Sequence, residues 1–271
     1  MFVSDINNKK NFILNTNIKN LFNKKLSTLS PANINILRNK TANLLDEYYF
    51  ELLQFLNIEY FIECGSHDAT TSFNVADIYG IKSIAIEANP ITFNKLTLKN
   101  KHPKLKLLNL GLSDKNEELN FYIPKDNNLA MNSSFRIKSN QDLQKYNISK
   151  IKVLKLDKII DENLSKDSTF ALWIDVEGLS DKVLNGCKKN LNNKSKECKL
   201  IKIEVESTKI WKQQIKDQDI IFFLIGLGYR PLFRDFEYET QYNLIFIKNS
   251  YFDQTYDLSK KYENKFENLK L

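Results

Sequence analysis

The sequence contains few cysteines and histidines, and this scarcity limits the chemistry that it can carry. Three of its 271 residues are cysteine, and two, His67 and His102, are histidine. The cysteines (Cys64, Cys187 and Cys198) form no C-x-x-C pair and are odd in number, so neither a disulfide framework nor a zinc site is indicated. A Ser-His-Asp hydrolase or a site with several histidine ligands would need most of the histidines present, so the composition disfavours both.

Long apolar runs are also absent. A helix that crosses a bilayer needs about 20 predominantly apolar residues, and the sequence has no run of that kind. Residues 1–10 are polar and lack the apolar core of a secretory signal. We therefore expect no membrane span and a cytoplasmic protein.

Arginine is scarce although the chain is basic. The net charge is +7, yet only four of the 40 cationic residues are arginine, and the rest are lysine. Arginine is the preferred residue for bidentate contacts with phosphate. The chain is also rich in asparagine and isoleucine, so its lysine content agrees with the codon bias of an AT-rich genome. A nucleic-acid partner is therefore disfavoured, although a basic charge alone permits one.

The first 57 residues have a helical pattern. Ser30 and Pro31 are typical of a helix start, with serine as the cap and proline in the first turn. Apolar residues from Leu37 to Phe55 then recur at helical spacing. We predict an accessory helical segment at 1–57 that packs on the main domain or forms a homodimer, a main domain at 58–250, and a charged C-terminal tail at 251–271 that is a solvated helix or partly disordered.

From Tyr60 onward, short apolar runs alternate with amphipathic stretches. This alternation predicts a doubly wound α/β fold, a parallel sheet with helices on both faces. In such sheets the ligand lies at the carboxyl ends of the strands. Strands are expected at 60–64, 83–87, 106–110, 118–123, 151–156, 170–176, 200–205, 229–236 and 243–247, and helices at 71–79, 90–100, 180–190 and 219–227.

Two of the expected strand ends are typical of a nucleotide site. Gly65 follows the first strand and permits a sharp turn and a close approach of the backbone, but a dinucleotide fingerprint has three glycines here rather than one. Glu87 follows the second strand, and a carboxylate suits the two hydroxyls of a ribose. A turn that serves the fold alone, and a solvated glutamate at a strand end, are the alternatives. The missing glycines disfavour an NAD-dependent oxidoreductase.

Acidic residues follow the next strands. Asp175 and Glu177 come after the most apolar strand, and Glu204 and Glu206 end its predicted neighbour. Buried carboxylates are unfavourable unless they are paired or face a cleft, so these acids either line the site or lie in surface loops. Magnesium held by Asp175, Glu177 and Glu204 is an alternative that the oxygen ligands permit, but we predict no metal. The polar stretch 124–140 is long enough to be a functional loop.

Taken in order, these motifs resemble the FkbM-type methyltransferases. The segments IECGSHDA, IAIEANP, NLGLSD, NSS, VLKLDKII, WIDVEG and IKIEVE follow the family's order from about Tyr60 to Lys248, and the strand that runs into Asp-Val-Glu-Gly is the most specific. The resemblance implies a class I methyltransferase fold, a Rossmann-like sheet of seven strands with the last antiparallel. It also implies S-adenosylmethionine as cofactor and O-methylation of a sugar or polyketide hydroxyl.

The resemblance also implies roles for individual residues. Glu63, Gly65 and Ser66 correspond to the loop at the methionine side of the cofactor. Glu87 corresponds to the ribose-binding acid, and Asp175 lies at the reacting methyl. The remaining correspondence places two residues on the adenine side, Ser113 and Asp114.

The first motif departs from the family's usual Asp-x-Gly-Ala-Asn-x-Gly at three positions. Glu63 replaces the aspartate, His67 the asparagine and Ala69 the last glycine. Because a sugar hydroxyl is a poor nucleophile at neutral pH, a base must take its proton. Asp175 or His67 is the candidate, although His67 is also explained as a substrate contact or a plain substitution.

We therefore predict an O-methyltransferase that acts on a carbohydrate-containing or related small-molecule acceptor. The Asn127–Ser134 loop offers amides and hydroxyls to a sugar, and Trp211 or Tyr229 could supply an aromatic face. A nucleic-acid methyltransferase, and a non-catalytic scaffold that has lost its cofactor, are the alternatives.

Overall fold

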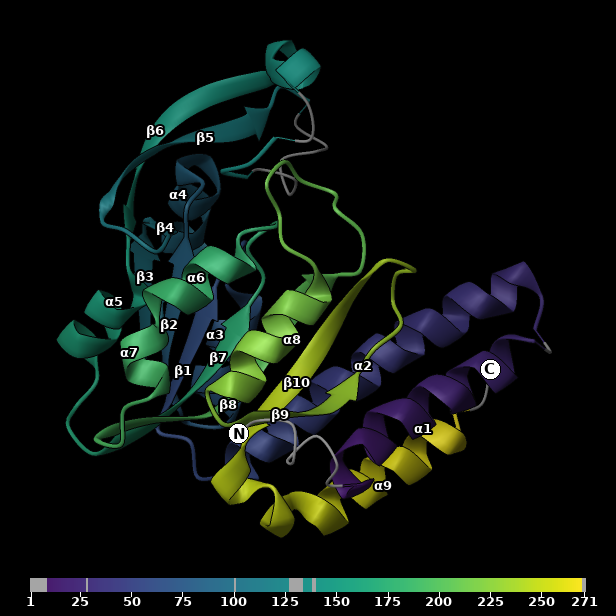
Figure 1. The fold of residues 1–271 in the computed structure, drawn as a ribbon. Coiled ribbons are helices and arrows are strands. Elements are labelled where there is room, and N and C mark those ends of the chain that lie inside the picture. The colour runs from purple at the N-terminus through teal and green to yellow at the C-terminus, as the bar shows by residue number, and fades with distance from the viewer. Residues whose placement is uncertain (1–8, 28, 100, 127–133, 138–139, 270–271) are drawn as a thin grey trace.

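The structure is a computed structural model that describes residues 9–27, 29–99, 101–126, 134–137 and 140–269. It contains a central sheet with helices on both faces, a small second sheet above one edge, and a group of helices from both ends of the chain (Figure 1). None of the described helices is long and apolar enough to cross a membrane.

The central sheet has seven strands in the order β3-β2-β1-β7-β8-β10-β9. The first five in that order are mutually parallel, and β10 is antiparallel to both β8 and β9. The expected doubly wound sheet of seven strands with an antiparallel last strand is therefore confirmed. The strands are β1 (Tyr60–Cys64), β2 (Lys82–Glu87), β3 (Leu105–Asn109), β7 (Ser168–Ile174), β8 (Lys196–Glu206), β9 (Tyr229–Arg234) and β10 (Gln241–Lys248).

Helices cover both faces of this sheet, which explains why its central strands are apolar on both sides. One face packs against α5 to α8 through a core that includes Ile62, Leu172 and Ile203. The opposite face packs against α2 and α3 through Phe61 and Ala171. The helices are α3 (Thr70–Ile78), α4 (Pro90–Lys99), α5 (Leu156–Asn163), α6 (Ser180–Gly186), α7 (Lys188–Leu191) and α8 (Asp217–Gly226).

The N-terminal segment forms α1 (Lys9–Leu26) and α2 (Pro31–Phe55), and α2 begins at the predicted cap, where Ser30 accepts a hydrogen bond from the Asn33 amide at 3.4 Å. The apolar side of α2 lies against the sheet, and the Tyr49 hydroxyl donates to the Leu172 carbonyl at 2.8 Å. The stripe that suggested a partner is thus covered within the chain.

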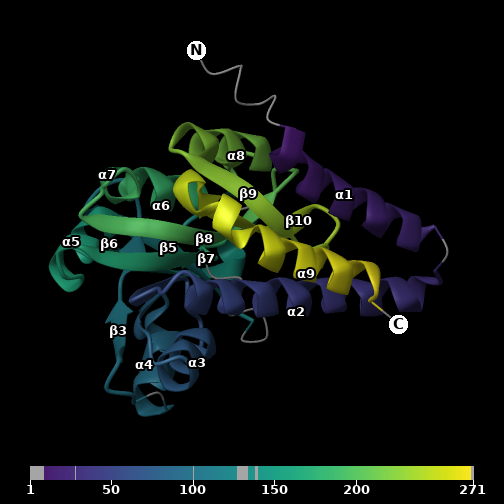
Figure 2. The ribbon, with the colours of Figure 1, turned by 90° about the horizontal axis from the view of Figure 1, so that it is seen from below.

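The C-terminal tail is not a solvated segment, contrary to our expectation. It forms α9 (Tyr256–Glu267), which lies beside α1 and α2 (Figure 2). Tyr262 and Phe266 are fully buried, and Tyr262 stacks on Tyr48 of α2. Charged residues that suggested solvation flank this stripe and pair with α2, as Lys261 does with Glu51 at 2.6 Å. High charge and a buried apolar stripe coexist because a helix separates its faces.

A second sheet of three strands stands apart from the first, in the order β4-β6-β5. It consists of β4 (Gly111–Leu112), β5 (Glu117–Pro124) and β6 (Tyr146–Leu154), and a 3₁₀ turn, η3 (Asn140–Lys145), precedes β6. The strands expected at 118–123 and 151–156 therefore exist, but as a hairpin outside the central sheet. Figure 1 shows this hairpin rising beyond the central strands, next to the loops that form the site.

Candidate active site

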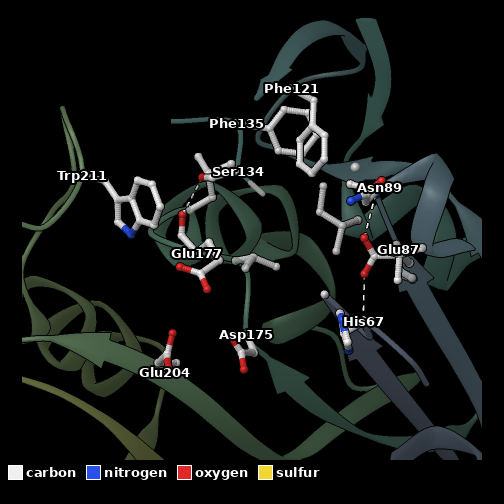
Figure 3. Close-up of a pocket in the computed structure, with 18 of the residues that line it drawn as sticks. His67, Glu87, Asn89, Phe121, Ser134, Phe135, Asp175, Glu177, Glu204 and Trp211 are labelled. Carbon is white, nitrogen blue, oxygen red and sulfur yellow. Dashed lines mark hydrogen bonds between the residues drawn. The ribbon is translucent and has the colours of Figure 1, made fainter. Parts of the chain in front are cut away.

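A cavity of about 510 Å³ opens at the carboxyl ends of the central strands. Its lining includes Gly65 and His67 after β1, Glu87 at the end of β2, Asp175 after β7 and Glu204 near the end of β8. Sequence reasoning placed these residues together because parallel strands end at one edge of a sheet, and the structure brings them to one cavity (Figure 3).

Gly65 makes the turn between β1 and α3, at a point where the ends of β1 and β7 are in close contact. Its φ of +83° lies in the left-handed region that favours glycine. A Cβ atom built on it would stand 1.8 Å from the backbone oxygen of Asp175. The Asp175 amide donates to the Cys64 carbonyl at 2.9 Å, and the Gly65 amide to the Ile86 carbonyl at 2.9 Å. The backbone of Asp175 therefore occupies the space that a side chain at 65 would need.

Glu87 presents its carboxylate to the cavity from the end of β2. One oxygen accepts a hydrogen bond from the His67 amide at 2.8 Å, and the other accepts one from the Asn89 amide at 2.7 Å. Burial raises the pKa of Glu87 to about 7, although these two donors oppose the shift. Each oxygen of a carboxylate can accept more than one hydrogen bond, so Glu87 keeps acceptor capacity for a ligand.

His67 lies at the rim of the same cavity, with an exposed side chain and a φ of +44°. The unusual backbone conformation aims its amide at Glu87. Figure 3 shows the imidazole between Glu87 and Asp175. Burial raises the pKa of Asp175, and a positive charge on this imidazole would lower it.

Glu63 and Ser66 are buried and do not line the cavity. One Glu63 oxygen accepts hydrogen bonds from the Ser72 amide at 3.0 Å and from the Ser72 hydroxyl at 2.5 Å. Ala69, the residue before α3, provides no side-chain cap, so the Glu63 carboxyl group caps the helix instead by accepting the hydrogen bond from the Ser72 amide in its first turn. The Ser66 hydroxyl is buried with no hydrogen-bond partner among the described residues.

Ser113 and Asp114 follow β4 and also lie off the cavity surface. Asp114 pairs with Lys182 at 2.9 Å. Burial raises the pKa of Asp114, but the hydrogen bonds and charge of its neighbours, chiefly Lys182, outweigh burial and lower it below its usual value. The carbonyl of Ser113 packs closely on Gly186. The neighbouring Gly111 and Leu112 line the cavity instead.

Two aromatic residues that sequence reasoning missed lie at this side of the cavity. Phe121 of β5 and Phe135 line it, with ring centroids 4.7 Å apart. Phe121 belongs to β5, and Phe135 lies in the connection between β5 and β6. The stretch 124–140 was predicted to be a functional loop, but no sequence pattern indicated either ring. Close packing of Phe135 requires the small residue at Gly111, where a Cβ would stand 2.3 Å from the ring.

The other side of the cavity carries acids and aromatic rings. Asp175 and Glu204 follow paired residues of neighbouring strands, and burial raises the pKa of both. Lys202 opposes the shift at Asp175. The remaining residues on this side, most of them missed by sequence reasoning, are Glu177, Ile210, Trp211, Glu237, Tyr238, Gln241 and Asn243.

Of the two predicted aromatic faces, Trp211 lines the cavity and Tyr229 does not. Tyr229 is fully buried in the sheet core, and its hydroxyl donates to the Cys198 carbonyl at 3.0 Å. That prediction was wrong for Tyr229, because β9 is the outer strand of the sheet and its start lies away from the carboxyl ends. Trp211 packs on Gly178, where a Cβ would stand 2.2 Å from the indole.

The polar loop at 124–140 lies partly outside the described residues, including 127–133. In its described part, the Ser134 hydroxyl donates to the Glu177 carbonyl at 3.0 Å and Arg136 donates to the Gly178 carbonyl at 2.5 Å. This part of the loop is therefore hydrogen-bonded to the segment that follows Asp175. Within the described ranges, no group of three or more His, Cys, Asp or Glu side chains is arranged to hold a metal ion.

Comparison with known proteins decides the family. A family model described as the FkbM methyltransferase domain matches residues 63–231, more than half of the chain. The chain belongs to the FkbM methyltransferase family. It is an S-adenosylmethionine-dependent methyltransferase, and the matched range contains every predicted site residue from Glu63 to Asp175. No curated protein matches the chain significantly.

Several solved structures are similar to this FkbM methyltransferase at low identity. A putative S-adenosylmethionine dependent methyltransferase from Listeria monocytogenes has 8% identity, with 70% of this chain and 91% of that chain covered, at a TM-score of 0.42. Magnesium protoporphyrin IX methyltransferase from Synechocystis PCC 6803, solved with bound S-adenosylmethionine, has 9% identity, coverages of 79% and 78%, and a TM-score of 0.40. M. capricolum TrmK, in complex with S-adenosyl-homocysteine, has 11% identity, coverages of 71% and 63%, and a TM-score of 0.39.

Proposed function

We propose that this methyltransferase acts on a hydroxyl group of a carbohydrate-containing acceptor or a related small molecule, with Asp175 beside the transferred methyl. In this arrangement Glu87 accepts the ribose hydroxyls of the cofactor, and the turn at Gly65 and Ser66 receives its methionine side. Gly65 supports this placement because it lines the cavity, whereas Ser66 is buried in the turn, where its carbonyl accepts a hydrogen bond from the Ala69 amide. Glu63 contributes by supporting the turn through α3.

The adenine side is proposed at the aromatic rings. Phe121 and Phe135 offer flat apolar surface next to Leu112, and aromatic rings prefer offset or edge contacts with other rings. In this proposal Ser113 and Asp114 act through the backbone, because they fix the conformation of the chain that presents Leu112.

The observation that carries the proposed acceptor class is the composition of the opposite side. Trp211 and Tyr238 offer aromatic faces there, and Gln241 and Asn243 offer amides. Hydroxyl-rich rings suit such a surface, since their C–H faces pack on aromatic rings and their hydroxyls pair with carboxylates and amides. Asn243 is held in place by Asp235, which accepts hydrogen bonds from its amide groups at 2.9 Å.

The same surface disfavours a nucleic-acid acceptor. None of the described residues that line the cavity is lysine or arginine, whereas five of them are acidic: Glu87, Asp175, Glu177, Glu204 and Glu237. Binding of nucleic acid depends on cations that neutralise phosphates. The net charge of +7 therefore lies elsewhere on the molecule.

The reaction requires the protein to align the acceptor hydroxyl with the methyl group and to supply a base. The cofactor supplies an electrophilic methyl group when it is bound, so the protein need not activate the donor. Asp175 is fixed at the backbone by its amide bond to Cys64, and its carboxylate faces the cavity (Figure 3). It accepts the hydroxyl proton as the acceptor oxygen attacks. His67, across the cavity, orients the acceptor or favours ionisation of Asp175.

The test is release of S-adenosylhomocysteine in the presence of sugars, glycolipids, RNA and DNA. We expect activity with a hydroxyl acceptor and a loss of about 10²-fold or more in turnover for Asp175→Asn, the scale of a lost general base, while cofactor affinity is retained. Activity confined to RNA or DNA would overturn the acceptor class. Full turnover of Asp175→Asn would overturn the role of that carboxylate.

A further inference from the structure

The Asp175 and Glu204 carboxyl groups lie on neighbouring strands at the floor of the cavity. Strands β7 and β8 are parallel, and Ile174 pairs with Ile203 in their register. The next residue of each strand is therefore the acid, and both acids line the cavity. Residues that pair in a parallel register project to the same face of the sheet, so the two carboxyl groups lie next to each other. Two neighbouring carboxylates repel each other when both are ionised, which favours one proton held by the pair.

The surroundings indicate which carboxyl holds that proton. Lys202 lies below Asp175 and favours its ionised form, whereas Glu204 is opposed by the charges of Asp175 and Glu177. Lys202 is itself buried between the Trp173 ring, 3.2 Å from the ring centroid, and Asp46 of α2, at 2.5 Å. The favoured state is thus a protonated Glu204 beside an ionised Asp175.

Other charged and titratable groups act on the pair from every neighbouring element. They are His67 after β1, Glu63 and Glu87 of β1 and β2, Glu177 after β7, Lys202 and Glu206 of β8, and Glu237 and Tyr238 after β9. Most of these are acids, and this excess of negative charge keeps a proton within the pair at neutral pH.

We propose that Asp175 and Glu204 act as one acid–base pair that holds a single proton at rest and takes up the proton of the acceptor hydroxyl during methyl transfer. This proposal rests on the proposed function, which places Asp175 beside the methyl group. The acceptor oxygen forms its bond to the methyl carbon as the carbon–sulfur bond breaks, and the hydroxyl proton passes to Asp175.

The net charge of the groups in the cavity does not change during this step. The positive charge of the sulfonium disappears when the thioether is formed, and the pair gains one proton at the same time. A neighbouring positive charge lowers the proton affinity of a carboxyl group. The pair therefore binds its proton weakly before transfer and strongly after it, which suits a base that must be ionised only while the methyl donor is intact.

This coupling can be measured without knowledge of the acceptor. S-adenosylmethionine and S-adenosylhomocysteine differ in the methyl group and in the sulfonium charge. We expect the first to release more protons from the full-length protein on binding than the second. A charge within about 4–6 Å lowers a carboxyl pKa by about 1–3 units, so the difference should reach roughly half a proton at some pH between about 5 and 9. Titration calorimetry in buffers of different ionisation enthalpy gives these proton numbers.

Glu204→Gln removes the proton reservoir and should abolish the difference between the two ligands. Glu206→Gln is the matched control, because Glu206 lies two residues further on the same strand, is buried, and has a pKa raised to about 7 by burial, but does not line the cavity. It should keep the wild-type difference.

Equal proton release with both ligands in the wild type would overturn the proposal, and this result needs no variant. A difference that persists in Glu204→Gln, or that is lost in Glu206→Gln, would also overturn it, by assigning the proton to another group. If the proton difference follows the prediction but no sugar or glycolipid releases product, the acceptor class fails and the pair stands.

Discussion

Replacement of Gly65 by alanine tests whether the contact between the ends of β1 and β7 organises the site. The new Cβ would stand 1.8 Å from the Asp175 carbonyl oxygen and 2.9 Å from its carbon, at a φ of +83°. Backbone hydrogen bonds hold both strand ends in place, so neither can move easily to relieve this clash. Left-handed strain contributes about 1–2 kcal/mol, and overpacking against fixed atoms about 1–3 kcal/mol.

The expected loss of stability is therefore about 2–5 kcal/mol, a fall in Tm of roughly 5–15 °C for a chain of this size. Since Asp175 must move, affinity for S-adenosylhomocysteine should fall as well. Thermal unfolding and titration calorimetry measure the two effects.

Gly80→Ala provides the control for backbone strain alone. Gly80 has a φ of +67°, but the nearest atom to its Cβ position is the flexible end of Lys104, at 3.1 Å. It should lose only about 1–2 kcal/mol and bind the cofactor normally. If Gly65→Ala were no less stable than Gly80→Ala and bound equally well, the proposed contact with Asp175 would not organise the site.

Three further outcomes are expected. Gly178→Ala would place a Cβ 2.2 Å from the Trp211 indole, so turnover of the acceptor should fall while cofactor affinity is kept; equal losses in both would show that Trp211 does not serve the acceptor alone. Burial raises the pKa of Glu63 from 4.5 to about 7, so its stabilising contribution is complete below about pH 4.5 and is lost as pH rises through 7. Glu63→Gln should reduce this loss in denaturant titrations by about 1.4 kcal/mol for each pKa unit, and an unchanged pH dependence would contradict the shift. Removal of residues 1–57 should expose the sheet face that α2 covers and cause aggregation in light scattering, whereas a monodisperse, fully active product would show that the segment is dispensable.

The sequence predicts the central sheet well because its signals are local. Each apolar strand ends in a polar motif, and parallel strands bring their ends together. Sequence patterns alone therefore predicted that Gly65, Glu87 and Asp175 lie together, and the three residues line one cavity in the structure. The antiparallel last strand followed from the family resemblance and is confirmed.

Features that depend on distant segments were not predictable in the same way. Phe121 and Phe135 line the cavity from the hairpin and its connecting loop. The polar stretch 124–140 indicated a functional loop, but no local pattern showed that these two rings would reach the cavity. The many charged residues of α9 made it read as a solvated tail, although it carries a buried apolar stripe that includes Tyr262 and Phe266. A motif also fixes where a residue lies but not where its side chain points, and the Glu63 carboxylate turns to α3 rather than to the cavity.

The most direct test of the account is the affinity of Glu87→Ala for S-adenosylmethionine. A lost hydrogen bond to a charged acceptor amounts to about 1.5–3 kcal/mol, so titration calorimetry should show binding weaker by roughly ten- to a hundredfold. Glu206→Gln is the matched control, since its carboxyl group is also buried with a pKa raised to about 7 but does not line the cavity, and it should bind close to the wild type. Unchanged affinity in Glu87→Ala would contradict the assignment of this cavity as the cofactor site.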